Sequence, residues 1–160
     1  MSNILNDIKV SPSLVFMDIF DETDKKIIEK LSTHLFNQGL VKKSYIQAIL
    51  KREEVFPTGL QCEDIGVAIP HTDPEHVLTQ SIAIGILKEP VLFRQMGSND
   101  IEVPVQIVLM LAVKEPQKQI GFLQELMGLL QQKKTFITLL GCKSQQEAVD
   151  KFNDFFEKRK

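Results

Sequence analysis

The sequence predicts an α/β fold, a single-domain sandwich in which helices flank a small mixed β-sheet on both faces. Residues 105–113 are almost all apolar, as expected of a strand that is covered on both faces. Segments with helical periodicity lie on both sides of it in the sequence, at 24–36 and from residue 116 onward. A chain of 160 residues fits one domain, over residues 1–160, and can bury a core without a metal or a disulfide.

Two helices are predicted in the first third of the chain. The first covers residues 24–36, and Gly39 is placed to end it. Ser44 is expected to cap the second helix, which Pro57 and Gly59 bring to an end. Apolar side chains recur at helical spacing in both, at Ile27, Ile28, Leu31 and Leu35 and then at Ile46, Ile49 and Leu50.

The middle of the chain is predicted to supply the strands. An extended segment at residues 65–69 is closed by Pro70, which has no N–H to donate to a ladder. Small and branched residues alternate at 81–87, which indicates a buried strand, and residues 91–93 fit a short one. Residues 105–113 form the most clearly predicted strand.

The last third is predicted to be helical again. Pro116 suits the first turn of a long helix, because the N–H that proline lacks has no partner there anyway. A short helical segment is expected at 135–140, and Ser144 should cap a last helix that runs to Phe155. The expected core stripe of the long helix comprises Ile120, Leu123, Leu126, Met127 and Leu130.

Composition argues against several classes of protein. With 19 basic and 21 acidic residues the net charge is -2, which gives no electrostatic footprint for nucleic acid. Residues 1–10 contain no long apolar segment typical of a secretory signal, and the apolar run at 107–113 is too short to insert into a membrane. Cys62 and Cys142 are far apart and fit reduced thiols. We therefore expect a cytoplasmic protein.

The three histidines differ in their surroundings. His34 lies within the first predicted helix, where a packed or surface role is expected, and His76 lies in a polar loop, where solvation is expected. His71 directly follows the strand that Pro70 ends, and loops at strand ends are where α/β folds hold reactive groups. Spacing alone leaves a functional and an inert His71 equally open.

Several chemistries can be weighed against these residues. A metal site from His71, Asp73, His76 and Cys62 lacks the tight spacing of zinc ligands, so no metal is predicted. The Gly-x-Ser-x-Gly hydrolase motif and glycine-rich phosphate loops are absent, so no nucleotide or other cofactor is predicted. Covalent phosphoryl chemistry on the imidazole remains. Arg52 and Thr58 could receive the phosphate charge, although residue type alone favours a surface ion pair of Arg52 with Glu53 or a neighbour.

Three short motifs occur in order across residues 51–71. They are Lys-Arg-Glu at 51–53, Phe-Pro-Thr-Gly at 56–59 and Gly-Val-Ala-Ile-Pro-His at 66–71. This pattern resembles enzyme IIA domains of the fructose/mannitol branch of the bacterial phosphotransferase system. The resemblance continues through 107–112 and the long helix, so that a domain core of about 14–156 is implied. Residues 54–59 and 114–119 are most similar to galactitol-type IIA proteins.

The resemblance implies a phosphoryl carrier, which is a phosphotransferase component that needs neither nucleotide nor metal. The histidine that matches His71 accepts a phosphoryl group from the carrier protein HPr and passes it to a cysteine of the cognate IIB protein. A membrane IIC subunit then couples transfer to uptake of galactitol or a related polyol. Arg52 would neutralise the phosphoryl oxygens, and Thr58 would lie in the pocket.

One position departs from the family pattern. Mannitol-type members have a second histidine at the start of the long helix, where this chain has Gln119. Glutamine can donate a hydrogen bond to phosphate but carries no charge, so Gln119 is at most an auxiliary donor. The rim around His71 should be apolar, with Val67, Ile69, Val77 and Leu78 as candidates. An alternative function is regulatory, in which phosphorylation of His71 controls a binding partner instead of transport.

Overall fold

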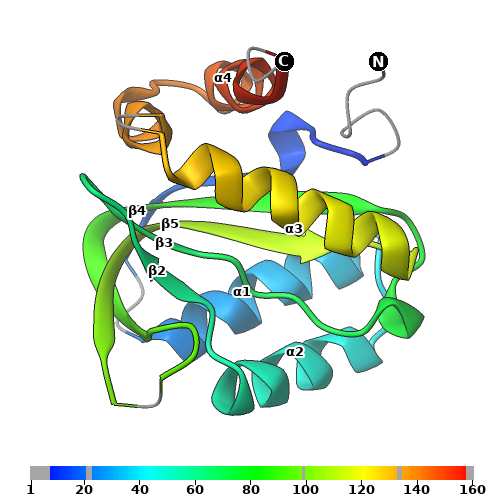
Figure 1. Cartoon of the computed structure of the whole chain (residues 1–160). Coiled ribbons are helices and arrows are strands. Elements are labelled where there is room, and N and C mark those ends of the chain that lie inside the picture. Colours follow the sequence, from blue (N-terminus) through cyan, green and yellow to red (C-terminus); the bar gives the residue numbers. More distant parts are fainter. Residues whose placement is uncertain (1–7, 21–22, 99, 133–134, 158–160) are drawn as a thin grey trace.

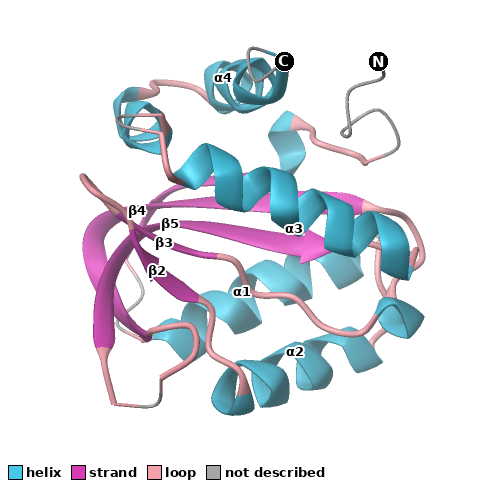
Figure 2. Cartoon of the chain, viewed as in Figure 1, coloured by secondary structure: helices cyan, strands magenta, loops and turns pink. Residues whose placement is uncertain are grey.

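The protein is a three-layer sandwich, described here from a computed structural model that places residues 8–20, 23–98, 100–132 and 135–157. Helices α1 (Asp24–Asn37) and α2 (Ser44–Val55) cover one face of the sheet. Helices α3 (Pro116–Leu130) and α4 (Gln145–Glu157) cover the other, as Figure 1 and Figure 2 show. The predicted fold class is confirmed. The segment 1–10, which was expected to contain no secretory signal, lies mostly outside the described residues.

The sheet is mixed and has five strands in the order β1-β4-β5-β3-β2. Two neighbouring pairs are parallel, β1 with β4 and β3 with β5, and the other two are antiparallel. Within the described residues, three short 3-10 helices lie in the connections: η2 (Pro12–Leu14), η3 (Pro74–His76) and η4 (Phe136–Gly141). The strands are β1 (Val15–Ile19), β2 (Gly59–Gln61), β3 (Gly66–Ala68), β4 (Ser81–Arg94) and β5 (Glu102–Ala112).

Strand β5 joins the two halves of the core. Ile107, Leu109 and Leu111 pack with α3 and α4, whereas Val108 and Met110 pack with α1 and α2. All five side chains are fully buried or nearly so. The apolar run in the sequence is explained by this burial on both faces, as predicted.

The strands differ from the prediction at three places. Strand β4 joins the segments 81–87 and 91–93, which were expected to be separate, into one strand whose register shifts between Ile86 and Val91. Pro90 lies in this irregular stretch, where no ladder N–H is needed. Strands β1 and β2 were not predicted. They have only five and three residues, and sheet pairing stabilises them: β1 pairs with the much longer β4, and β2 pairs with the equally short β3.

Most predicted helix ends are confirmed. Gly39 ends the α1 region with a φ of 75°, and Pro116 lies in the first turn of α3. The hydroxyl of Ser144 accepts a hydrogen bond from the Glu147 N–H at the start of α4. The prediction for Ser44 was wrong. It is the first residue of α2, and its Oγ pairs with Nδ1 of His76 at 2.8 Å instead of capping the helix.

The predicted core stripe of α3 was partly wrong. Ile120 is 58% exposed, whereas Leu126 and Leu130 are buried as expected. The stripe is centred on Phe122, Leu126 and Leu129, and a helix turns about 100° per residue, so Ile120 faces away from the sheet. Among the described helices, none is long and apolar enough to cross a membrane.

Candidate active site

The candidate site lies at the edge of the sheet where parallel strands β3 and β5 end. Pro70 and His71 follow β3 with only Ile69 between, and α3 begins shortly after β5. The N–H of Leu111 donates to the carbonyl of Pro70 at 3.0 Å, which fixes the loop after β3 against the end of β5. In Figure 1 this edge faces η3 and the first turn of α3. The topology therefore places His71 on a rigid support.

The imidazole of His71 is half-buried and held through one ring nitrogen. Its Nδ1 lies 2.8 Å from the carbonyl oxygen of Ile69, and a carbonyl can only accept, so Nδ1 carries the proton. Burial is the main cause that lowers the pKa of His71, and the positive charge of Arg52 lowers it further. The hydrogen bond to Ile69 and the negative charge of Asp73 act in the opposite direction and raise the pKa. Burial thus favours the neutral ring, and with the proton on Nδ1 the remaining lone pair lies on Nε2, the nitrogen that could act as a nucleophile.

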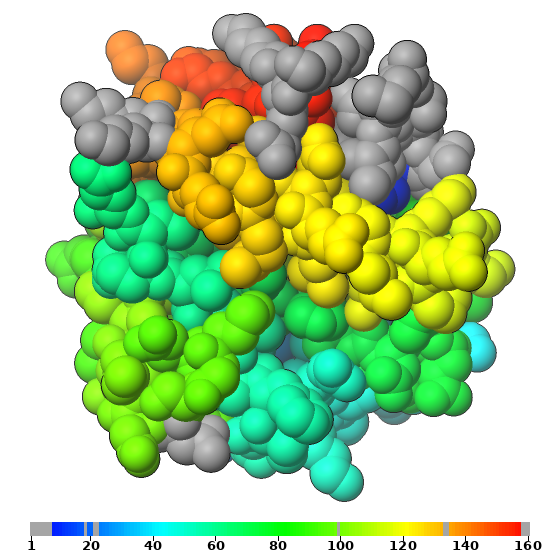
Figure 3. Space-filling view, in the orientation of Figure 1, coloured from blue at the N-terminus to red at the C-terminus, as the bar shows by residue number. Residues whose placement is uncertain are grey.

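Arg52 reaches the site from the last turn of α2. Its Nη1 lies 3.5 Å from Oδ1 of Asp73, and its guanidinium carbon lies 5.1 Å from the centre of the Phe56 ring. The alternative noted from sequence, an ion pair with a neighbour, is thus present, with Asp73 and not with Glu53. Arg52, Phe56, Thr72 and Asp73 line one groove between α2 and the loop after β3, and Figure 3 shows the surface hollowed there.

Thr58 is buried and bonded to Glu53. The backbone N–H of Thr58 donates to Oε2 of Glu53 at 2.8 Å, and its hydroxyl donates to Oε1 at 2.9 Å. The carbonyl of Thr58 in turn accepts the N–H of Ile69 at 3.4 Å. A hydrogen-bond chain therefore runs from α2 through Thr58 to Ile69 and the ring of His71. Because its hydroxyl proton is directed at Glu53, Thr58 orients the loop in this structure.

Glu53 is the ionisable member of that chain. Glu53 is 6% exposed, and burial raises its pKa to about 7. The hydrogen bonds from Thr58 and the charge of Arg94 lower this pKa, whereas the charge of Asp24 raises it. Arg94 also donates to the carbonyls of Glu53 at 3.4 Å and Glu54 at 2.7 Å. The end of α2, which carries Arg52, is thus fixed from two directions.

Tyr45 connects α2 to the same strand end. Its side chain is fully buried, and its hydroxyl donates to the carbonyl of Leu111 at 2.7 Å. Leu111 is the residue whose N–H holds Pro70. One residue of β5 therefore links the helix that bears Arg52 and the loop that bears His71. Burial raises the pKa of Tyr45, which keeps the phenol neutral and able to donate.

Gln119 lies in the first turns of α3, at the same edge of the sheet. It is half-buried, and its N–H donates to the carbonyl of Glu115 at 3.0 Å. The helical repeat puts Gln119 on the side of α3 that faces the sheet, with Phe122 and Leu126. This position is compatible with the auxiliary role predicted from sequence, and that role stays a prediction.

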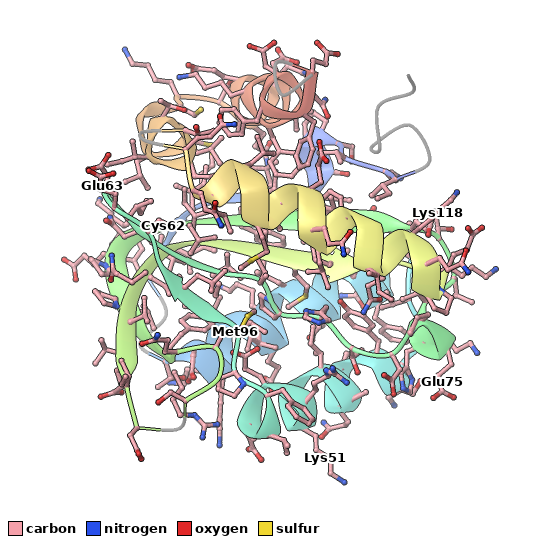
Figure 4. All side chains as sticks on the ribbon, viewed as in Figure 1. Lys51, Cys62, Glu63, Glu75, Met96 and Lys118 are labelled. Carbon is pink, nitrogen blue, oxygen red and sulfur yellow. The ribbon has the colours of Figure 1, made fainter. Side chains whose placement is uncertain are left out.

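The remaining histidines and Cys62 have other surroundings. Nε2 of His34 lies 2.8 Å from the carbonyl of Ser13, and its ring packs edge-on against Phe16, which fits the packed role expected of it. His76 is bonded to Ser44 and lines the groove. Figure 4 shows Cys62 and Glu63 at the end of the sheet away from η3. Within the described residues, no three acidic, histidine or cysteine side chains gather as metal ligands would.

The predicted rim was mostly wrong. Val67 and Ile69 are fully buried and Val77 nearly so, because they belong to the core and not to the surface. Leu78 is exposed as expected. The exposed apolar side chains beside Arg52 are Val55 and Phe56, at 58% and 59%.

Three side chains that contact the site have roles that the sequence did not predict. Glu53 and Tyr45 are placed by buried hydrogen bonds to Thr58 and Leu111, and Asp73 by its contact with Arg52. Glu53 did give one signal in the sequence: it follows Arg52 and continues the apolar face of its helix, where an acidic residue is unusual. Asp73 was considered only as a metal ligand, and Tyr45 gave no signal beyond its residue type.

Comparison with known proteins decides the family. Residues 9–154 match the family described as "Phosphoenolpyruvate-dependent sugar phosphotransferase system, EIIA 2". The chain belongs to this EIIA family. Its motifs at 51–71, recognised in the sequence, are the segments that build the site described above.

Two relatives and one solved structure illustrate the range of this EIIA family. The galactitol-specific EIIA component of Escherichia coli K12 is 32% identical over 115 residues, which are 72% of this chain and 76% of that protein. The transcriptional regulator ManR of Bacillus subtilis is 38% identical over 104 residues, which are 65% of this chain but 14% of that protein. The chain also shares its fold with a solved structure, a complex of mannitol enzyme IIA and phosphorylated IIB from Escherichia coli. The TM-score is 0.72 at 22% identity, and the match covers 95% of this chain and 99% of that one.

Proposed function

We propose that this EIIA protein carries a phosphoryl group on Nε2 of His71, in the cytoplasm, between HPr and a cysteine of a IIB protein. The observation that carries the proposal is the bond from Nδ1–H to the Ile69 carbonyl, which leaves Nε2 as the nucleophile, together with Arg52 beside the loop. Family membership and the motifs at 51–71 support it.

The transfer can be written on these groups alone, without nucleotide or metal. The Nε2 lone pair attacks phosphorus, and the bond from phosphorus to the donor breaks with its electron pair returning to the donor. The ring then carries both Nε2–P and Nδ1–H and is positive, and the Ile69 carbonyl holds that proton. When a IIB thiolate attacks phosphorus, the Nε2–P bond breaks and the ring recovers its lone pair.

Arg52 is proposed to stabilise the phosphoryl oxygens, because a guanidinium can hold two of them at once. Thr58 is proposed to support transfer through the Glu53 chain, and Gln119 to donate at most one further hydrogen bond. The exposed Val55 and Phe56 offer apolar surface for the weak, fast encounters that a relay between two partners needs.

The substrate of the wider system is proposed to be galactitol or a related polyol, with a membrane IIC protein downstream. This rests on the similarity to the galactitol-specific EIIA component. The IIA protein need not contact the sugar, so the test is transfer from the phosphorylated protein to purified IIB proteins of galactitol and mannitol type. Faster labelling of a mannitol-type IIB would contradict the proposed substrate.

The proposed site is tested by phosphorylation with phosphoenolpyruvate, enzyme I and HPr. We expect one acid-labile phosphate per chain, on Nε2 of His71 by nuclear magnetic resonance, and none in His71→Ala. His34→Ala is the matched control, because His34 is tied to Ser13 and should leave phosphorylation intact. Phosphate uptake by His71→Ala, or phosphate on Nδ1, would overturn the assignment.

A regulatory function is the second candidate, and one observation favours it. The match to ManR shows that a segment like this occurs within a transcriptional regulator. In that case phosphorylation of His71 would alter binding to a protein partner, and transfer to IIB would be absent. The IIB assay therefore separates the two functions.

A further inference from the structure

The Arg52–Asp73 pair has a feature that ordinary loop geometry does not explain. Asp73 occupies the N-cap position of η3, where a carboxylate usually accepts a hydrogen bond from the helix, yet it makes no side-chain cap bond. Its Oδ1 is instead 3.5 Å from Nη1 of Arg52, with the two side chains 62% and 37% exposed. The acid is therefore held towards α2 and away from its own helix.

The same guanidinium is the group proposed above to hold a phosphoryl group on His71. Asp73 follows His71 by two residues, and its negative charge reaches the ring, since it raises the pKa of His71 while Arg52 lowers it. A phosphoryl group bears about −1.5 to −2 charges at neutral pH, more than one carboxylate. The two anions would compete for one cation and repel each other.

We propose that Asp73 is a positioning residue that occupies Arg52 until the phosphoryl group arrives and then competes with it. This inference rests on the proposed function and deepens it. Asp73 holds the empty guanidinium in place beside the loop, so that little reordering is needed when phosphate arrives. By competing afterwards, Asp73 weakens the grip of Arg52 on phospho-His71 and keeps the group ready for transfer.

No bond to Asp73 forms or breaks in this scheme. The phosphoryl group moves between its donor, Nε2 of His71 and the acceptor thiolate as written above, and Asp73 exchanges one ionic contact for solvent. The measurable quantity is the equilibrium constant between phospho-HPr and the phosphorylated protein. Removing the competitor should shift that equilibrium towards phospho-His71.

The first test compares Asp73→Asn with wild type. We expect the equilibrium constant to shift about three- to tenfold towards the phosphorylated protein, which is the scale of one solvent-exposed charge contact together with the lost repulsion. Glu75→Gln is the matched control, because it removes one negative charge from the same loop, and Figure 4 shows Glu75 on the outer side of η3. Its equilibrium should remain within about twofold of wild type.

The second test asks whether Asp73 acts through Arg52. In an Arg52→Gln background, Asp73→Asn should shift the equilibrium less than it does with Arg52 present. An equal or larger shift in that background would show that Asp73 acts by direct repulsion of the phosphoryl group. It would overturn the proposal that the two anions compete for Arg52. An unchanged equilibrium in Asp73→Asn alone would also overturn it. Failure of the proposed function looks different, since wild type itself would then take up no phosphate on His71.

Discussion

Both faces of the sheet carry an apolar core, but the aromatic cluster under α3 and α4 and the end of the α2 face near His71 depend on different interactions. On the α3 and α4 face, the rings of Phe122, Phe152 and Phe156 pack at 5.2 to 5.4 Å, with Phe136 and Phe155 beside them. On the α2 face, at the edge that bears His71, buried polar groups are joined by short hydrogen bonds. Apolar packing is non-directional and supplies stability, whereas hydrogen bonds fix positions. Mutations on the two faces should therefore fail in different ways.

The largest expected effect is on stability, from the aromatic face. Phe152→Ala empties a fully buried position and should lower the free energy of unfolding by about 3–5 kcal/mol, measured by denaturant titration. Phosphoryl transfer per folded molecule should stay close to wild type, because Phe152 makes no bond to the site. The control is Ile120→Ala on the exposed side of α3, with a loss below about 0.5 kcal/mol.

That contrast would break if Phe152→Ala slowed transfer in molecules shown to be folded, for example at low temperature with native circular dichroism. The aromatic face would then have to act on the site through β5, and the separation between stability and positioning would be lost.

The next effect is on transfer, from the α2 face. Arg52→Lys should slow phosphorylation of His71 by roughly tenfold, because a point charge replaces a planar fork that can hold two oxygens. Stability should change little, since the Arg52 side chain is partly exposed. Initial rates of labelling from phospho-HPr measure this effect. Lys51→Arg is the matched control, as Figure 4 shows Lys51 directed to solvent on the same helix, and equal slowing in both variants would refute the special role of Arg52.

The smallest expected effect is on the pH dependence of stability, and it comes from the buried side chain of Glu53. Burial raises the pKa of Glu53 in the folded protein to about 7, from 4.5 in a free side chain. The folded protein therefore binds the proton more tightly, so the associated stability is present below pH 4.5 and is lost as pH rises through 7. Glu53→Gln imitates the protonated acid and should gain on the order of 1 kcal/mol relative to wild type between pH 5 and pH 8.

Denaturant titrations of both proteins at the two pH values measure this difference. The control is Glu54→Gln, whose carboxylate is exposed and pairs with Lys25, and which should follow the wild-type pH dependence. A constant difference between wild type and Glu53→Gln at both pH values would show that Glu53 does not titrate in this range.

The sequence was informative where structure is local. The helices, the buried strand β5 and the caps at Gly39 and Ser144 follow from periodicity and residue type over short distances. Strand β1 was missed because five residues with an acid among them carry too little pattern, and its pairing with β4 is a long-range contact. Ile120 was wrongly placed in the core because apolar residues occur on more than one side of α3, and periodicity alone does not show which side faces the sheet.

For the candidate site, residue type and motif order singled out His71 and Arg52, but not the groups that they contact. Tyr45 and Leu111 are 66 positions apart, and only the folded chain brings them to 2.7 Å. The contact of Arg52 with Asp73 likewise depends on how α2 lies against the loop after β3. Thr58 shows the limit most clearly, since its hydroxyl looked free for phosphate in the sequence but is bonded to a buried acid in the fold.

The group that orients the His71 ring is a main-chain carbonyl, and this affects how the site tolerates mutation. An orienting side chain can be lost through a single codon change, whereas the carbonyl of Ile69 is present whichever amino acid stands at that position. Position 69 can therefore vary among apolar residues of similar volume while Nδ1 of His71 keeps the same acceptor. Only a change that rotates the peptide, such as replacement of Pro70, would alter which nitrogen is presented. The choice of Nε2 as the proposed phosphoryl acceptor is thus protected against most point mutations around it.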